Sequence, residues 1–125
     1  YVVECNSNTL RKINMTSPFA VTTIAGNGVA SSTDGNGLAA EFNNPHGIET
    51  DGSNLFITEY NGQRIRRVNI ASLDVFTIAG ANGYQDGTGA GAQLGNLGGI
   101  TTDGNRLYFV DSSNNALRRI DNAPD

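Results

Sequence analysis

The sequence predicts an all-β protein built from repeated units of antiparallel strands. A long internal repeat is the first reason, and short β-branched or aromatic runs separated by turn residues are the second. The composition is the third, because charged residues make up only 16% of the 125 residues, against about 25% in typical domains. Gly, Asn, Thr and Ser take their place, and Gly and Asn supply the positive-φ positions of tight turns.

The internal repeat has an offset of 52 residues, since Gly-Ile-x-Thr-Asp-Gly occurs at 47–52 and again at 99–104. Later motifs recur in the same order. Ile-Arg-Arg-Val-Asn at 65–69 returns as Leu-Arg-Arg-Ile-Asp at 117–121, and Leu-Arg-Lys-Ile-Asn at 10–14 is a third copy. Thr-Ile-Ala-Gly and Asp-Gly-x-Gly each occur twice, at 23–26 and 77–80, and at 34–37 and 86–89. Such a period indicates stacked supersecondary units.

Each unit contains four strand-like runs. In the complete copy these are Gly47–Thr50, Leu55–Glu59, Arg64–Asn69 and Val75–Ala79. The first two are joined across an Asp-Gly pair, which is a strong hairpin signal. Four short strands per repeat are typical of a propeller blade. A helical solenoid is excluded because no Gly-free run of about twelve residues has the 3.6-residue period of a helix.

These motifs resemble the NHL repeat family. The likeness rests on the Gly-Ile-x-x-Asp-Gly start, the Leu-Tyr-type second strand ending in Asp or Glu, and the Ile-Arg-Arg-Ile third strand. The Asp-Gly-x-Gly loop with a later Phe resembles a bacterial subgroup. The resemblance implies a β-propeller, a fold that serves in this family as a binding platform, as an RNA-binding domain and in a few lyases and lactonase relatives. Activity must therefore be argued from a site.

We expect about two and a half blades. A partial blade is expected at 1–26, a full blade at 46–80 and a partial blade at 98–122, with long loops at 27–45 and 81–97. The first blade should lack its innermost strand and the third its outermost strand. A closed propeller takes roughly four to eight blades, so we expect the remaining blades, or further copies of the chain, to pack against these open ends.

One end of the blades is predicted to be the candidate binding face. Connections alternate between the two ends of a blade, so both long loops lie at the same end as the turn between the second and third strands. The candidate residues there are Asn61, Asn114, Asp34, Asp86 and His46. Long loops without secondary structure are often functional. They can also be Ω-loops that cap the core through residues such as Phe42 and Leu94, and the two interpretations are compatible.

The sequence does not predict a catalytic or metal site. Asp34 and Asp86 begin turns that lack the further ligands and terminal Glu of a calcium loop, so we expect each to accept hydrogen bonds within its own turn. His46 is the single histidine and its repeat counterpart is Gly98. No second histidine can build a metal cage, and no nucleophile–base pair can be assembled. We therefore expect a non-enzyme without metal or cofactor.

The charges argue against nucleic acid as a partner. The net charge is −4, whereas nucleic-acid binding needs a basic surface. Paired cations such as Arg66-Arg67 recur, but neighbours in a strand point to opposite faces. Because each pair follows a carboxylate on the preceding strand, we expect cross-strand or inter-blade ion pairs. These carboxylates are Glu4, Glu59 and Asp111.

The expected function is binding or assembly through protein partners, in an extracellular or cell-envelope protein. The low charge and the abundance of Asn, Thr, Ser and Gly motivate that location, and no apolar run is long enough for a membrane span of roughly 18 residues. The alternative is a propeller enzyme of lyase or lactonase type whose catalytic residues lie in other blades.

Strand alternation and repeat equivalence also predict which apolar side chains pack between blades. Ile65 and Val68 have opposite parity in one strand, so a bulge or two different faces are expected. The predicted packing residues are Leu55, Ile57, Ile65, Val68, Ile78, Ile100, Leu107, Phe109, Leu117 and Ile120.

Overall fold

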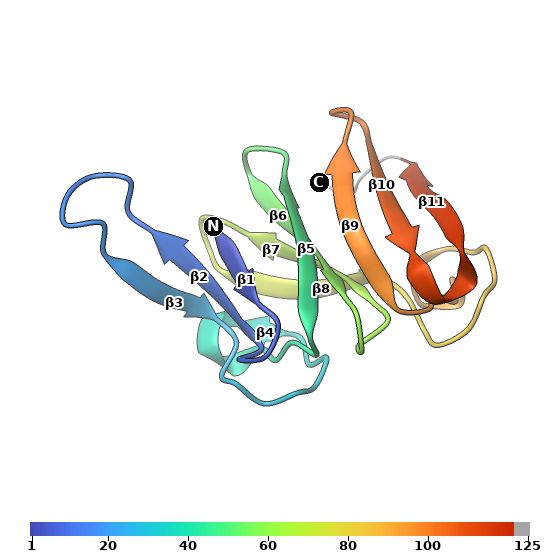
Figure 1. Ribbon diagram of the computed structural model, residues 1–125, viewed down its shortest axis with the longest axis horizontal. Helices are drawn as coiled ribbons and strands as arrows, with labels where there is room; N and C mark the ends of the chain where they lie inside the picture. Colours follow the sequence, from blue (N-terminus) through green and yellow to red (C-terminus); the bar gives the residue numbers. More distant parts are fainter. Residues whose placement is uncertain (122–125) are drawn as a thin grey trace.

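The computed structural model describes residues 1–121, which form three antiparallel sheets standing side by side (Figure 1). We call them the first, middle and third blades. The first blade contains β1 (Val2–Glu4), β2 (Thr9–Ile13) and β3 (Val21–Ala25). The middle blade contains β4 (Gly35–Asn36), β5 (Pro45–Thr50), β6 (Asn54–Glu59), β7 (Ile65–Asn69) and β8 (Asp74–Ala79). The third contains β9 (Leu97–Thr102), β10 (Arg106–Asp111) and β11 (Ala116–Asp121).

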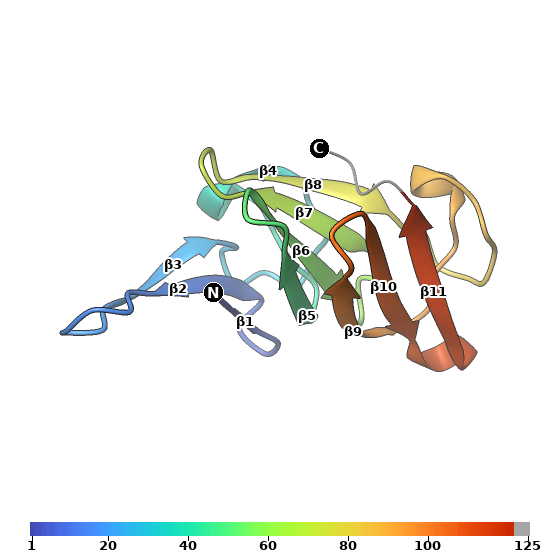
Figure 2. The same ribbon diagram turned by 90° about the horizontal axis from the view of Figure 1, so that it is seen from above.

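The expected all-β fold of antiparallel blades is confirmed. Strand order in the middle blade is β4-β8-β7-β6-β5, so β5 is its inner edge. Seen from above, β5 and β9 lie beside each other and the sheets spread apart toward β8 and β11 (Figure 2). The last residue expected in the third blade, 122, lies outside the described residues. No helix within residues 1–121 is long and apolar enough to cross a membrane.

The middle blade has a fifth strand that the sequence pattern does not reveal. β4 comes from the first long loop and pairs antiparallel with the outer edge of β8, with Gly35 opposite Val75. A 3-10 turn, η1 (Gly37–Ala39), follows it, and the second long loop contains the corresponding turn η2 (Gly89–Gly91). Both loops therefore contain regular structure and follow similar paths.

The turns at the other end of the blades are built by aspartates. The Asp51 carboxylate accepts hydrogen bonds from the backbone N–H groups of Ser53 and Asn54. Asp103 accepts the equivalent pair in the third blade. Gly52 and Gly104 adopt φ values of 95° and 96°, a region that a side chain makes costly. These contacts explain why Asp-Gly recurs at both hairpins.

The core lies between neighbouring blades rather than within one sheet. Side chains of the first and middle blades form one apolar cluster, which contains Leu10, Ala25, Ala40, Phe42, Leu55, Ile57, Val68 and Val75. A second cluster joins the middle and third blades and contains Ile65, Ala79, Leu94, Leu97 and Phe109. Burial of this apolar surface holds the blades together.

The two clusters confirm most of the predicted packing residues and explain the parity conflict. Ile65 packs toward the third blade and Val68 toward the first, and the β7–β8 register shifts between Ile65 and Arg66. Ile100 is only half-buried. Leu117 does not show its predicted packing within residues 1–121, because its side chain is 74% exposed and no described blade lies on that side of β11.

Candidate functional site

The candidate binding face lies at the lower end of the blades in Figure 1. The β1–β2 and β6–β7 turns and the 3-10 turn η3 (Ser112–Asn114) all lie at this end. Among the predicted residues, His46 and Asn61 are exposed here. His46 is the second residue of β5, and its ring lies beside Tyr60 with 6.1 Å between centroids. These three residues form a small exposed polar and aromatic surface.

Asp34 has a different role from the one expected. Its carboxylate accepts hydrogen bonds from the Arg66 guanidinium at 3.0 Å and from the Thr77 hydroxyl at 2.8 Å. Both donors are far away in sequence, on β7 and β8. The Asp-Gly turn therefore serves to fasten the first long loop to the middle blade.

Arg66 is the centre of that attachment. Its side chain is fully buried, pairs with the buried Glu59 carboxylate at 2.7 Å and lies over the Phe42 ring. It also donates to two carbonyl oxygens of the loop, those of Thr33 and Glu41. The predicted cross-strand ion pair is confirmed, and because a buried guanidinium needs several acceptors, the loop supplies the rest.

Burial raises the pKa of the Glu59 carboxyl above its ordinary value, while Arg66 and the Ser32 hydroxyl oppose that rise. The Asn43 backbone N–H also donates to this carboxylate at 3.1 Å. Glu59 therefore links the arginine of β7 to the segment that leads into β5.

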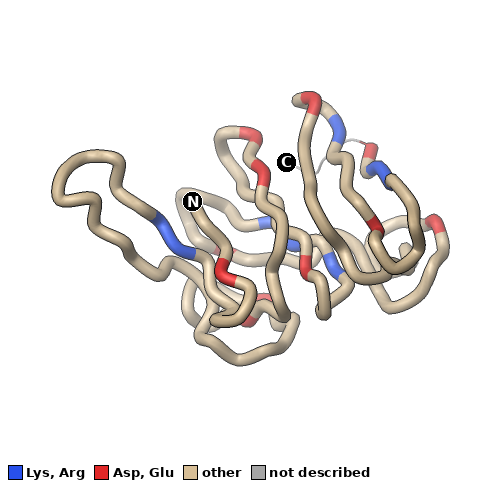
Figure 3. The backbone as a smooth tube through the Cα atoms, viewed as in Figure 1, with Lys and Arg blue, Asp and Glu red and all other residues tan. Residues whose placement is uncertain are grey.

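The third blade repeats this arrangement. Arg118 pairs with Asp111 at 3.1 Å and with Asp86 at 2.9 Å, and lies over the Tyr84 ring. It donates to the carbonyl oxygens of Gln85 and Gln93, the counterparts of Thr33 and Glu41. In the first blade Arg11 pairs with Glu4 at 3.2 Å. Figure 3 shows basic and acidic residues interspersed along the backbone of the three blades.

Asn114 supports the loops and is only partly exposed. Its amide donates to the Asp111 carboxylate at 3.0 Å and to the Gly83 carbonyl at 3.1 Å. The structure thus brings His46 and Asn61 onto one surface, whereas Asn114, Asp34 and Asp86 belong to the attachments of the loops. Within residues 1–121 no three His, Cys, Asp or Glu side chains are placed to hold a metal ion.

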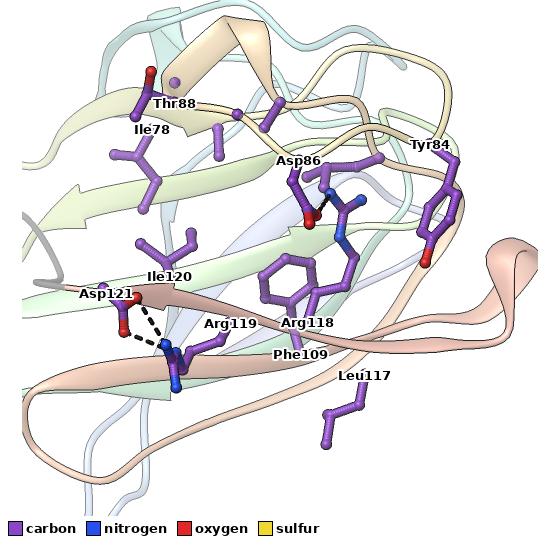
Figure 4. Close-up of a pocket in the computed structure, with 15 residues that line it drawn as sticks. Ile78, Tyr84, Asp86, Thr88, Phe109, Leu117, Arg118, Arg119, Ile120 and Asp121 are labelled. Atoms are coloured by element: carbon purple, nitrogen blue, oxygen red, sulfur yellow. Dashed lines mark hydrogen bonds and ion pairs between the residues drawn. The ribbon is translucent and has the colours of Figure 1, made fainter.

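A groove of about 660 Å³ lies along the outer edge of β11, on the side where the third blade is expected to lack its outermost strand. Its walls come from three places: the end of β8, the second long loop and β10–β11. Figure 4 shows Phe109 and Ile120 among the side chains that line it, with Arg118 reaching to Asp86. The recurring Thr-Ile-Ala-Gly strand is the signal that could have found it, since that motif occurs only twice for three blades.

No family model matches the chain. A curated protein, "Protein SUPPRESSOR OF QUENCHING 1, chloroplastic" from Arabidopsis thaliana, is 26% identical over 133 residues. That match covers 97% of this chain but only 12% of the Arabidopsis protein.

Solved structures from Bacteroides share the fold. A protein of unknown function from Bacteroides thetaiotaomicron has a TM-score of 0.84 and 24% identity over 94% of this chain and 30% of its own. An auxiliary nutrient binding protein from Bacteroides ovatus has a TM-score of 0.80 and 16% identity over 92% and 32%. A Bacteroides thetaiotaomicron protein named "Putative phosphatase" has a TM-score of 0.79 and 17% identity over 97% and 31%. These likenesses show the fold, an all-β arrangement of propeller-type blades. The chain spans about a third of each solved chain.

Proposed function

We propose that this chain is a non-catalytic binding module, made of NHL-type propeller blades that pack against further blades or protein partners. The proposal is supported by the contacts of the acidic side chains that would otherwise be candidates for catalysis. Glu59, Asp111 and Asp34 are all engaged by arginines that hold the loops in place.

The outer face of the third blade is the observation that carries this proposal. Leu117 is 74% exposed, whereas its counterparts Leu10 and Ile65 are completely buried against the next blade. Val110 is likewise 45% exposed, and its counterpart Thr58 is completely buried. Exposed apolar residues at positions that are core elsewhere in the same repeat favour an interaction surface.

The nature of one structural neighbour also supports binding. The Bacteroides ovatus protein with this fold is named as an auxiliary nutrient binding protein. Together with the low charge and polar composition, this favours a binding protein of the extracellular space or cell envelope. The partner we favour is protein, because Leu117 and Val110 occupy repeat positions whose counterparts are buried elsewhere in the chain.

A second function is favoured by the neighbour named as a phosphatase. In that case these blades are the scaffold of a propeller enzyme whose catalytic residues come from elsewhere in the protein. Channel-facing His, Asp or Glu residues in additional blades would distinguish this function from binding alone.

Sedimentation velocity over a range of concentrations tests the blade-to-blade contact. Copies of the chain should associate, and Leu117→Lys should weaken association by about tenfold because a charge would enter an apolar contact. Leu38→Lys is the matched control, because Leu38 is 58% exposed in a loop and its counterpart Ala90 is also exposed. Monomers at every concentration, or equal weakening by both variants, would contradict the proposal.

A further inference from the structure

The groove beside β11 is lined by the repeat counterparts of residues that surround Val75 in the middle blade. There, Val75 of β8 packs in the apolar cluster with Ala25, Ala40, Phe42, Ile57 and Val68. The repeat counterparts of these five residues all line the open groove, and they are Ala79, Ala92, Leu94, Phe109 and Ile120. The groove is therefore a second copy of the Val75 pocket.

The hydrogen bonds at the rim of the groove repeat those of the middle blade, except that the aspartate has one donor fewer. Asp34 accepts hydrogen bonds from Arg66 and from the Thr77 hydroxyl of β8, and its side chain is 48% exposed. Asp86 accepts from Arg118 in the same way, but its side chain is 99% exposed. Within residues 1–121 no threonine hydroxyl donates a hydrogen bond to the Asp86 carboxylate. A hydroxyl arriving from the groove would complete the pattern.

Backbone segments on both sides of the groove can pair with an added strand. In the middle blade β8 lies between β7 and β4, with Val68 and Gly35 both opposite Val75. In the third blade, within residues 1–121, β11 pairs only with β10. The counterparts of Val68 and Gly35 are Ile120 and Gly87, and both line the groove. An antiparallel strand between them would find ladder partners on both edges.

The strands β3 and β8, which occupy the equivalent position in the first and middle blades, indicate which sequence fits the groove. β3 reads Val-Thr-Thr-Ile-Ala and β8 reads Val-Phe-Thr-Ile-Ala from Val75, each followed by Gly. They pair with β2 and β7 in the same register, with Thr23 opposite Arg11 and Thr77 opposite Arg66. Both pairings also shift register before the final alanine.

We propose that the groove beside β11 is a strand-binding site for a segment of sequence Val-x-Thr-Ile-Ala-Gly, a fourth strand of the same repeat type. Its valine lies opposite Ile120 between Ala92 and Phe109, and its threonine lies opposite Arg118 and donates to the Asp86 carboxylate. The site recognises backbone along both edges and side chains at alternate positions, as in β-strand addition. The inference rests on the proposed function and extends it by naming the partner at this edge, where Leu117 of the outer face also lines the groove.

Binding of a labelled peptide tests the proposal. The peptide is this chain's own residues 74–80, Asp-Val-Phe-Thr-Ile-Ala-Gly, titrated with the 125-residue chain and followed by fluorescence anisotropy. We expect saturable binding with one peptide per chain. Peptide Val75→Asp should weaken binding by at least tenfold, because it places a charge in the apolar pocket. Failure of the unaltered peptide to bind the folded chain would overturn the proposal.

Two protein variants test where the peptide lies. Ala92→Leu fills the valine position and should abolish binding, whereas Ala90→Leu, two residues away and outside the groove, should not. Thermal unfolding of both variants shows whether each is folded. Unchanged binding to folded Ala92→Leu would overturn the proposed location.

A double-mutant cycle tests the threonine–aspartate contact. Asp86→Asn in the protein and Thr77→Val in the peptide should each weaken binding by several-fold, and together by little more than either alone, since both remove one interaction. Glu49→Gln is the control, because it neutralises a carboxylate outside the groove. Additive effects would overturn the assigned register. Peptide binding combined with a failure of copies to associate would separate this inference from the proposed function.

Discussion

The Thr58 hydroxyl connects two blades by donating a hydrogen bond of 2.6 Å to the Gly98 carbonyl. The same oxygen accepts the Gly47 N–H at 2.9 Å. Thr58 is completely buried on β6, while Gly98 belongs to β9 of the next blade. One hydroxyl thus satisfies a backbone group on each of two neighbouring blades.

We expect Thr58→Val to lower the free energy of unfolding by about 1–3 kcal/mol, because the similar shape keeps the packing but leaves two backbone groups without a partner. Urea unfolding measures the change. Thr101→Val is the control, since the Thr101 hydroxyl is exposed and contacts only the Glu49 carboxylate. A loss no larger than that of the control would contradict the role of Thr58.

The buried pair of Arg66 and Glu59 gives a larger prediction. Arg66→Met removes the charge partner of a fully buried carboxylate and releases the first long loop, which should cost about 3–5 kcal/mol. Arg119→Met removes an exposed pair with Asp121 and should cost about 0–1 kcal/mol. Chemical denaturation of both variants provides the comparison. Similar small losses would mean that Arg66 does not fasten the loop.

The Asp103 turn predicts a dependence of stability on pH. Hydrogen bonds from the Asn105 and Arg106 N–H groups and from the Tyr108 hydroxyl lower the pKa of Asp103 below its ordinary 3.8. A lowered pKa in the folded state means that this stabilisation is present above pH 3.8 and is lost as the pH falls through the folded value. Asp103→Asn should flatten the acid loss of stability measured by urea midpoints, and Tyr108→Phe should flatten it partly. Identical acid profiles for all three proteins would refute this account.

The absence of catalysis is a further prediction. The chain should not turn over phosphoesters or lactones above buffer rates, and His46→Ala should leave any background unchanged, because within residues 1–121 the His46 ring lies beside Tyr60 and belongs to no cluster that could hold a metal ion. Elemental analysis after dialysis should find no stoichiometric zinc or calcium. Turnover abolished by His46→Ala, or one retained metal ion per chain, would be evidence for an enzyme.

Much of the fold could be predicted from local pattern. Hairpins at Asp51-Gly52 and Asp103-Gly104 and the pairing of Arg66 with Glu59 depend on residues close in sequence or on one strand register. The role of Asp34 could not be predicted, because its partners come from β7 and β8 and depend on the path of the loop. The same path creates β4, a strand of two residues with no periodicity to detect. Leu117 was predicted to pack because repeat equivalence assumes a neighbouring blade on every side, and it has no packing partner among the described residues.

Backbone amide exchange of the dilute, monomeric chain tests the central claim most directly, namely that the third blade presents an open strand edge in an otherwise complete repeat. Alternate residues of an antiparallel strand direct their N–H groups to opposite neighbours. Amides throughout β7 should therefore be protected, because that strand lies between β6 and β8. In β11 only the amides that face β10 should be slow, and the alternate ones should become slow when the 74–80 peptide is added. Uniform protection along β11 without peptide would contradict the account.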